Sequence, residues 1–75
     1  MNINYKSIGE RVRAFRRQKG MTQEQLAEFA ALTSVSISFI ETGKKNPSLS
    51  SVLKIAFVFE ITTEELLKEV VTQES

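Results

Sequence analysis

The sequence contains no cysteine and no histidine. Neither disulfide bonds nor thiolate chemistry can support the fold, so the chain is compatible with a reducing compartment. The side chain that most often acts as a general base is missing, and a metal site would have to use carboxylates alone. We therefore expect neither an enzyme nor a bound metal or cofactor.

Long apolar segments are missing as well. No run approaches the roughly 20 residues of a membrane span, and the N-terminus lacks the apolar centre of a signal peptide. The 75 residues, 41% hydrophobic and 25% charged, suit a small globular domain near the lower size limit for an independent core. We expect a soluble cytoplasmic protein with one domain over residues 1–75, no membrane partner and no small-molecule ligand.

The charge is distributed unevenly, although the net charge is only +1. Residues 1–59 contain nine Lys or Arg and four Glu, whereas residues 60–75 contain one Lys and five Glu. This division indicates that the basic body of the chain, not its acidic end, meets a polyanion. For any single charge run, a solvated helix face is the simpler explanation.

One helix-start pattern recurs along the chain: an apolar residue, a hydroxyl cap, two residues, a polar partner and another apolar residue. Residues 21–26 and 61–66 fit it fully, because the Thr can cap free N–H groups while the flanking apolar residues pack together. Residues 32–37 have a weaker polar partner, Ser7 begins a capping box without the apolar pair, and Ser48 makes a plain cap.

These five starts predict five helices with short connections, and no alternating strand pattern competes with them. Short connections force neighbouring helices to pack together, so we predict a compact all-α bundle with a frayed end after residue 71. The expected helices span about 7–19, 23–30, 34–42, 49–59 and 63–71.

The helices at about 23–30 and 34–42 are separated by a short turn around Ala31, which is a helix-turn-helix arrangement. Here the chain resembles the phage-repressor-like (Cro/XRE-type) family of DNA-binding domains. The resemblance covers about Ile8 to Leu67 and is strongest in GMTQEQLA at 20–27, IxxIExGK at 37–44 and NPSL at 46–49. It implies an all-α, five-helix repressor-like domain whose recognition helix, at about 34–42, enters the DNA major groove.

The resemblance also implies roles for individual positions. Arg16 and Glu41 match a structural ion pair, and Gln23 matches a phosphate contact at a helix N-terminus, where free N–H groups favour anions. The base-contacting positions are Ser34, Val35, Ser38 and Phe39. The positions along the DNA backbone are Gln23, Thr42, Lys44, Lys45 and Asn46.

Val35 and Phe39 are unusual among the base-contacting positions, because they cannot form hydrogen bonds with a base. Helical spacing places Ile37 and Ile40 on the buried face, so Val35 and Phe39 should be exposed. We interpret them as contacts for thymine methyl groups, which favour A·T pairs. Two alternatives stay open: the helix is rotated and buries both residues, or both bind a protein partner.

The chain departs from the family at two positions where glycine is usual. Ala31 occupies the turn, which is tolerable only if its backbone avoids positive φ. Glu60 ends the helix at 49–59, so that end is expected to be strained or differently shaped.

Phe57 exceeds what one monomer's core needs, because the helix at 49–59 already has a buried face. We predict a homodimer interface formed by Phe57, Leu67, Val70 and Val71. In the alternative, the helix at 63–71 covers Phe57 within one chain.

These observations predict a dimeric transcription regulator that binds double-stranded DNA at a pseudo-palindromic operator. The alternative is an antitoxin-like or other protein-binding module that uses the same fold.

Overall fold

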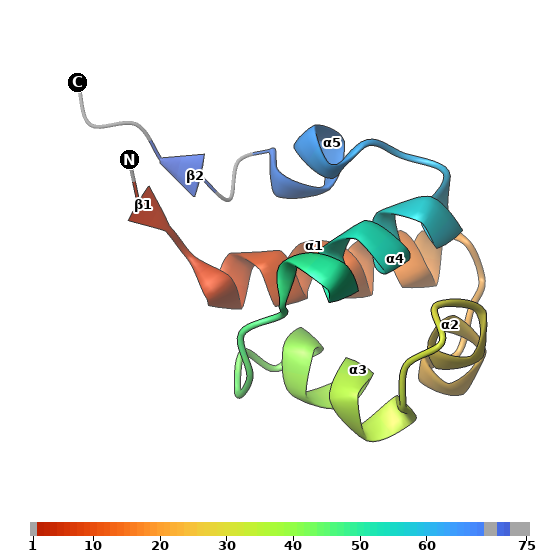
Figure 1. The fold of residues 1–75 in the computed structure, drawn as a ribbon. Helices are drawn as coiled ribbons and strands as arrows, with labels where there is room; N and C mark the ends of the chain where they lie inside the picture. Colours follow the sequence, from red (N-terminus) through yellow and green to blue (C-terminus); the bar gives the residue numbers. More distant parts are fainter. Residues whose placement is uncertain (1, 69–70, 73–75) are drawn as a thin grey trace.

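The computed structural model describes residues 2–68 and 71–72, with side chains from residue 4 to residue 68. Within these residues the chain forms five helices, so the predicted all-α fold is confirmed. The helix α1 crosses the molecule; in the view of Figure 1, α2 and α3 lie below it, α5 lies above it, and α4 passes in front of it. The helices are α1 (Tyr5–Gln18), α2 (Gln23–Phe29), α3 (Ser34–Glu41), α4 (Leu49–Phe59) and α5 (Thr63–Leu67).

Two short strands join the ends of the chain. The strands β1 (Asn2–Ile3) and β2 (Val71–Thr72) form an antiparallel pair in which Asn2 faces Thr72. They place residues 2–3 and 71–72 together at one side of the molecule (Figure 1). Strands of two residues are too short to leave an alternating sequence pattern, so the sequence did not predict them.

The C-terminal part of the chain therefore differs from the prediction. The helix α5 ends at Leu67 rather than at residue 71, because Lys68 already has an extended backbone, with φ −59° and ψ 135°. Thr72, expected to be frayed, belongs to β2.

Hydroxyl caps begin four of the helices, as predicted. Thr22 forms the complete capping box: its Oγ1 accepts from the Gln25 N–H at 3.0 Å, and its own N–H donates to Gln25 Oε1 at 2.9 Å. The caps of α3, α4 and α5 are Thr33, Ser48 and Thr62. These caps satisfy N–H groups that a helix N-terminus leaves free.

The start of α1 was predicted wrongly. Its cap is Asn4, whose Oδ1 accepts from the Ser7 N–H at 3.2 Å, so the helix begins before Ser7. Asn caps a helix as well as Ser does. Because Asn4 lies three residues before Ser7, the helix begins earlier than predicted.

The five helices share one apolar core. Phe15 of α1 stacks on Phe59 of α4 with ring centroids 5.6 Å apart. Arg11 joins α1 to the end of α5, because its Nε and Nη2 donate to the carbonyls of Leu66 and Glu65 at 2.8 and 2.7 Å. The fully buried large side chains are Val12, Leu26, Ile37, Ile40, Ile55, Phe59 and Leu66.

Among the residues that the structure describes, two that are not glycine have positive φ, Ala31 at 54° and Glu60 at 58°. Ala31 therefore does not meet the condition under which alanine is tolerable in the turn, and the strain expected at Glu60 is present. Each of the two residues follows the last turn of a helix, and the N–H of the residue after it donates to a carbonyl of that helix. The Leu32 N–H donates to the Ala27 carbonyl at 2.8 Å, and the Ile61 N–H donates to the Ala56 carbonyl at 3.1 Å. Ending a helix with a residue in the left-handed conformation costs roughly 1–2 kcal/mol when that residue has a side chain.

Glu60→Gly is expected to raise the free energy of unfolding by roughly 0.5–1 kcal/mol, because relief of backbone strain exceeds the entropy cost of glycine. Removing a negative charge from the C-terminal end of α4 acts in the same direction. Thermal and urea denaturation measure the change. Glu60→Gln, which removes the charge but keeps the backbone strain, should give a smaller gain. A destabilised Glu60→Gly protein would contradict the assignment of strain.

Candidate nucleic-acid interface

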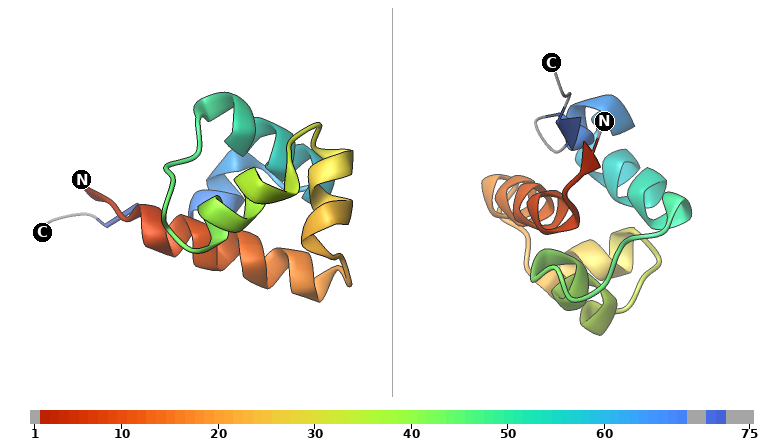
Figure 2. Two further views of the ribbon diagram at one scale, coloured as in Figure 1. Left: turned by 90° about the horizontal axis from the view of Figure 1, so that it is seen from below. Right: turned by 90° about the vertical axis from the view of Figure 1, so that its left-hand side faces the viewer.

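The helix α3 has one buried face and one exposed face. Ile37 and Ile40 are 0% and 1% exposed, whereas Val35 and Phe39 are 59% and 42% exposed. The alternative in which α3 is rotated to bury Val35 and Phe39 is therefore wrong. The helix lies at one edge of the molecule beside α2 and α1 (Figure 2), so its exposed face is open to a partner.

A buried ion pair fixes α3 against α1. Arg16 Nε donates to Glu41 Oε2 at 2.7 Å, and Arg16 Nη2 donates to Glu41 Oε1 at 3.1 Å. Arg16 Nη1 donates to the Met21 carbonyl at 2.8 Å, and Gln23 Nε2 donates to Glu41 Oε1 at 3.2 Å. The four hydrogen bonds offset the desolvation of both charges and connect α1, the start of α2 and the end of α3.

Gly9 allows the same two helices to approach closely. A Cβ atom at this position would overlap the carbonyl oxygen of Ile40 and would lie 2.9 Å from that of Glu41. The backbone of α1 therefore lies directly against the end of α3. Gly9 and the ion pair together set the position of the exposed face of α3.

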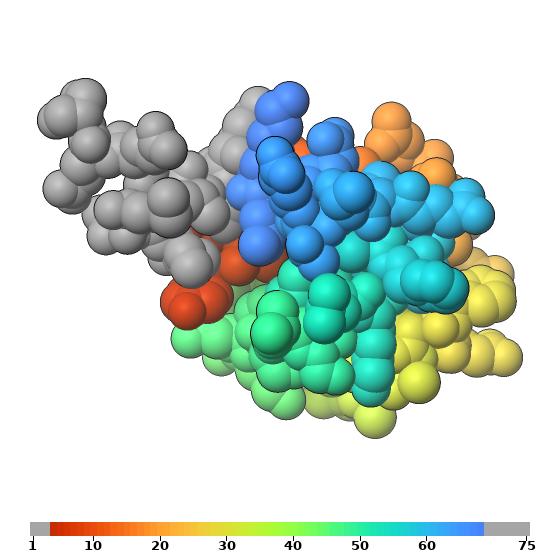
Figure 3. Space-filling view, turned by 45° about the horizontal axis from the view of Figure 1, so that its top comes forward, coloured from red at the N-terminus to blue at the C-terminus, as the bar shows by residue number. Residues whose placement is uncertain are grey.

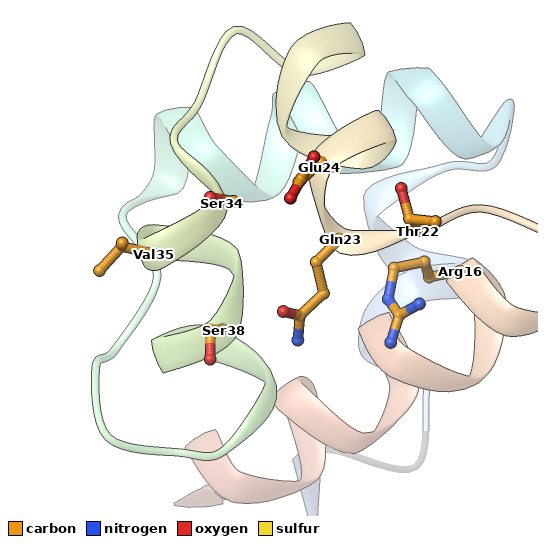
Figure 4. Close-up of a pocket in the computed structure, with 7 residues that line it drawn as sticks. All are labelled: Arg16, Thr22, Gln23, Glu24, Ser34, Val35 and Ser38. Atoms are coloured by element: carbon orange, nitrogen blue, oxygen red, sulfur yellow. The ribbon is translucent and has the colours of Figure 1, made fainter.

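A hollow of about 600 Å³ opens between the start of α2 and α3. Figure 4 shows Gln23 and Glu24 projecting from α2 toward this space, while Val35 points outward from α3. The N-terminus of α2 faces the same region, and its free N–H groups favour an anion. The residues lining the hollow are Arg16, Thr22, Gln23, Glu24, Ser34, Val35 and Ser38.

The loop after α3 carries the other predicted backbone-contacting residues. Gly43 has φ +76° and turns the chain, so the N–H groups of Lys44 and Lys45 donate to the Phe39 carbonyl at 2.9 and 3.2 Å. The Lys44 and Lys45 side chains are exposed, as is that of Asn46. Two cations thus adjoin the exposed end of α3.

One residue of this loop is more constrained. Thr42 Oγ1 donates to the Ser38 carbonyl at 2.9 Å. Its hydroxyl proton is therefore used within α3, and the oxygen remains an acceptor.

Of the four residues predicted for a dimer interface, the structure describes the side chains of Phe57 and Leu67. Phe57 is 84% exposed, so the alternative in which the C-terminal helix covers it is wrong. Leu67 is half-buried and packs against the protein's own core. Val70 and the side chain of Val71 lie outside the described residues.

Several surface residues were missed by the sequence analysis. Glu24 and Thr22 line the hollow, although they were considered only as parts of a helix start. Phe29, Leu49 and Leu53 are 65%, 73% and 51% exposed. The i, i+4, i+8 spacing of residues 49, 53 and 57 was a signal for a second apolar stripe on α4.

Comparison with known proteins decides the family. A family model described as helix-turn-helix matches residues 12–66. This chain belongs to the Cro/XRE-type helix-turn-helix family. In the structure, α2 and α3 are joined by a turn at residues 30–33, which is the helix-turn-helix arrangement.

Relatives within the helix-turn-helix family are similar in sequence and structure. An HTH-type transcriptional regulator of Archaeoglobus fulgidus is 48% identical over 56 residues, which cover 75% of this chain and 80% of the relative. The restriction-modification controller protein C.AhdI of Aeromonas hydrophila has a TM-score of 0.80 at 35% identity, covering 83% of this chain and 94% of that protein. A third similar protein is SinR, a master regulator for biofilm formation, whose structure was determined in complex with DNA. Its TM-score is 0.76 at 33% identity, and the match covers 80% of this chain and 97% of the SinR chain.

Membership of this helix-turn-helix family confirms the resemblance seen in the sequence. The family comprises DNA-binding transcription regulators, so the expectation that this chain is not an enzyme is also confirmed. Among the helices of residues 2–68, none is long and apolar enough to cross a membrane.

Proposed function

We propose that this protein is a cytoplasmic, homodimeric transcription regulator that binds double-stranded DNA sequence-specifically at a pseudo-palindromic operator. The observation that carries the proposal is the exposed face of α3. Core residues and a buried ion pair hold this helix firmly, yet Val35 and Phe39 remain open to solvent. A rigid helix with an exposed contact face suits the major groove, which is wide enough to admit an α-helix.

Within this proposal, α3 contacts the bases. Val35 and Phe39 pack against thymine methyl groups, which lie in the major groove and need no hydrogen-bonding partner. The hydroxyls of Ser34 and Ser38 donate to or accept from neighbouring base edges. Methyl contacts carry little information about G·C pairs, so DNA shape supplies a further part of the specificity.

The flanking elements contact phosphates. The α2 N-terminus and Gln23 bind one backbone segment, while Thr42, Lys44, Lys45 and Asn46 follow another. Gln23 is held in place because its amide donates to Glu41. Glu24, in the first turn of α2, places a carboxylate in the hollow, so the phosphate must approach the helix from the Gln23 side.

Phe39→Ala is expected to weaken binding to the preferred DNA sequence by roughly 1–3 kcal/mol while leaving binding to random DNA nearly unchanged. A methyl contact contributes to specific binding, whereas phosphate contacts are common to all sequences. Fluorescence anisotropy at one fixed salt concentration measures both affinities.

The control for this prediction is chemical. Replacing thymines of the preferred sequence with uracil removes the methyl groups. This replacement should lower the affinity of the unchanged protein for that sequence by a similar amount. The same replacement should have little further effect on the Phe39→Ala protein. An equal loss on preferred and random DNA would contradict a base contact by Phe39.

A further inference from the structure

The side chains of α3 offer no means of forming a bidentate contact with a purine. The helix has the sequence SVSISFIE over residues 34–41, so its only charged side chain is that of Glu41. Glu41 is buried and paired with Arg16. Guanine and adenine are usually recognised by paired hydrogen bonds from Arg, Lys, Asn or Gln, and none of these occurs in α3. The groups that α3 presents to a DNA groove are therefore serine hydroxyls and two apolar side chains.

Val35 and Phe39 form one apolar strip along α3. They are four positions apart, so they lie on one face of the helix, and they are 59% and 42% exposed. In the space-filling view, α3, in yellow-green, lies at the lower edge of the molecule, with α4 and α5, in cyan and blue, above it (Figure 3). Side chains at this spacing have Cβ atoms about 5–6 Å apart, which is less than two base steps of about 3.4 Å each along a DNA strand. The strip can therefore contact the C5 methyl groups of neighbouring pyrimidines.

The serines beside the apolar strip do not determine which pyrimidine is present. Ser34 and Ser38 line the hollow between α2 and α3 together with Val35. Among the described residues, the two serine hydroxyls form no hydrogen bond, so both are available to a ligand. A hydroxyl group both donates and accepts. It can therefore donate to O4 of thymine or accept from the N4 amino group of cytosine.

Thymine and 5-methylcytosine present the same methyl group to such a surface. Both bases carry it at C5, on the major-groove edge, and they differ at position 4, where thymine has a carbonyl oxygen and 5-methylcytosine has an amino group. The apolar strip contacts the methyl group, and the serine hydroxyls accommodate either substituent at position 4. This surface thus distinguishes a pyrimidine with a C5 methyl group from one without it, and not thymine from cytosine.

We propose that α3 binds 5-methylcytosine at the positions where it binds thymine, so that this protein distinguishes C5-methylated DNA from the same sequence without the methyl group. The inference rests on the proposed function, because it uses the same face of α3 in the major groove. Methylation of a cytosine at such a position gives Val35 or Phe39 an apolar group to bury. The proposed phosphate contacts of Lys44 and Lys45 are unaffected, since methylation leaves the DNA backbone unchanged.

Exchange of four pyrimidines at one position tests this inference. The position is the thymine of each half-site whose replacement by uracil lowers the affinity most. Four duplexes carry thymine, uracil, cytosine or 5-methylcytosine there, each with its pairing purine, and anisotropy at one salt concentration measures their affinities. Burial of one methyl group contributes roughly fourfold in affinity. With two half-sites we expect roughly tenfold tighter binding of thymine than of uracil, and a similar ratio for 5-methylcytosine over cytosine.

Substitutions of the protein assign the methyl effect to α3. In Val35→Ala or Phe39→Ala, according to which side chain lies over the exchanged base, both ratios should fall below about twofold. Phe29→Ala makes the same change at a phenylalanine that is 65% exposed at the end of α2, and it should leave both ratios in place. The dependence of affinity on salt should be the same for all four duplexes, because a methyl group adds no phosphate contact.

The possible outcomes separate this inference from the proposed function. A protein that prefers one sequence but binds 5-methylcytosine no better than cytosine would overturn the inference and leave the proposed function standing. A methyl effect that persists in both Val35→Ala and Phe39→Ala would also overturn it, because the methyl groups would then act through DNA shape. Equal affinity for every duplex, a scrambled one included, would instead show that the proposed function itself fails.

Discussion

Glu41→Ala is expected to lower the free energy of unfolding by roughly 3–5 kcal/mol, because it leaves the Arg16 guanidinium buried without its counter-charge. Both Glu41 oxygens accept from Arg16 in the structure, and the Glu41 side chain is only 2% exposed. Small domains have a total stability of about 5–15 kcal/mol, so this loss leaves a large part of the protein unfolded on mild heating. Urea denaturation followed by circular dichroism measures it.

The matched control removes both charges together. Arg16→Met with Glu41→Leu fills the site with apolar side chains of similar size and should recover most of the lost stability. It also removes the acceptor for Gln23, so DNA affinity should fall even when the fold recovers. If the double variant were less stable than Glu41→Ala, the ion pair would be a net stabilising interaction and not a positioning device.

Gly9→Ala is expected to destabilise the protein by roughly 3 kcal/mol or more, because the new methyl group overlaps backbone atoms that cannot move independently. The atoms it meets are the carbonyl oxygens of Ile40 and Glu41 at the end of α3. In an unobstructed helix the same substitution would stabilise by about 1 kcal/mol, so the sign of the effect tests the close approach. Chemical denaturation gives the sign and the size.

Gly20→Ala provides the comparison for this prediction. Gly20 has φ +70° and no neighbouring atom within 4 Å of an added Cβ, so it tests backbone strain without a steric overlap. We expect a loss of roughly 1–2 kcal/mol there. Equal losses at the two positions would show that α1 can move away from α3 at little cost.

The sequence predicted the parts of the fold that depend on local signals. Caps such as Thr22, Thr33 and Thr62 bind N–H groups within their own helix, so their effect can be inferred from a few neighbouring residues. The exposure of Phe39 followed from helical spacing for the same reason.

Features that depend on distant parts of the chain were not predicted. The role of Gly9 comes from the backbone of α3, more than 30 positions later in the chain. The β1–β2 pair joins opposite ends of the chain, and it has no local signature. The conformation of Ala31 stayed open at the level of the sequence, because its positive φ follows from closing α2 against the next turn and a residue type alone does not reveal it.

The same distinction between local and distant contacts applies to the candidate site. Motif positions placed Gln23 and the exposed face of α3 in one region, and in the structure Gln23, Ser34 and Val35 line one hollow. The cationic loop follows directly after α3, where the N–H groups of Lys44 and Lys45 donate to the Phe39 carbonyl.

Phe29 and Phe57 line the same two hollows only because α2 and α4 are neighbours, and this contact cannot be inferred from the sequence of either helix alone. Leu67, predicted for a dimer interface, also packs partly against the monomer core, and helical spacing alone did not reveal that contact.

Selection of bound fragments from a random double-stranded DNA library, followed by anisotropy on the selected and a scrambled duplex, tests sequence-specific binding most directly. Specific affinities of DNA-binding proteins exceed non-specific ones by about 10³-fold or more at physiological salt. We predict a ratio of this size and a selected sequence with two A·T-rich half-sites about one helical turn apart. Equal, weak affinity for every duplex would contradict the account.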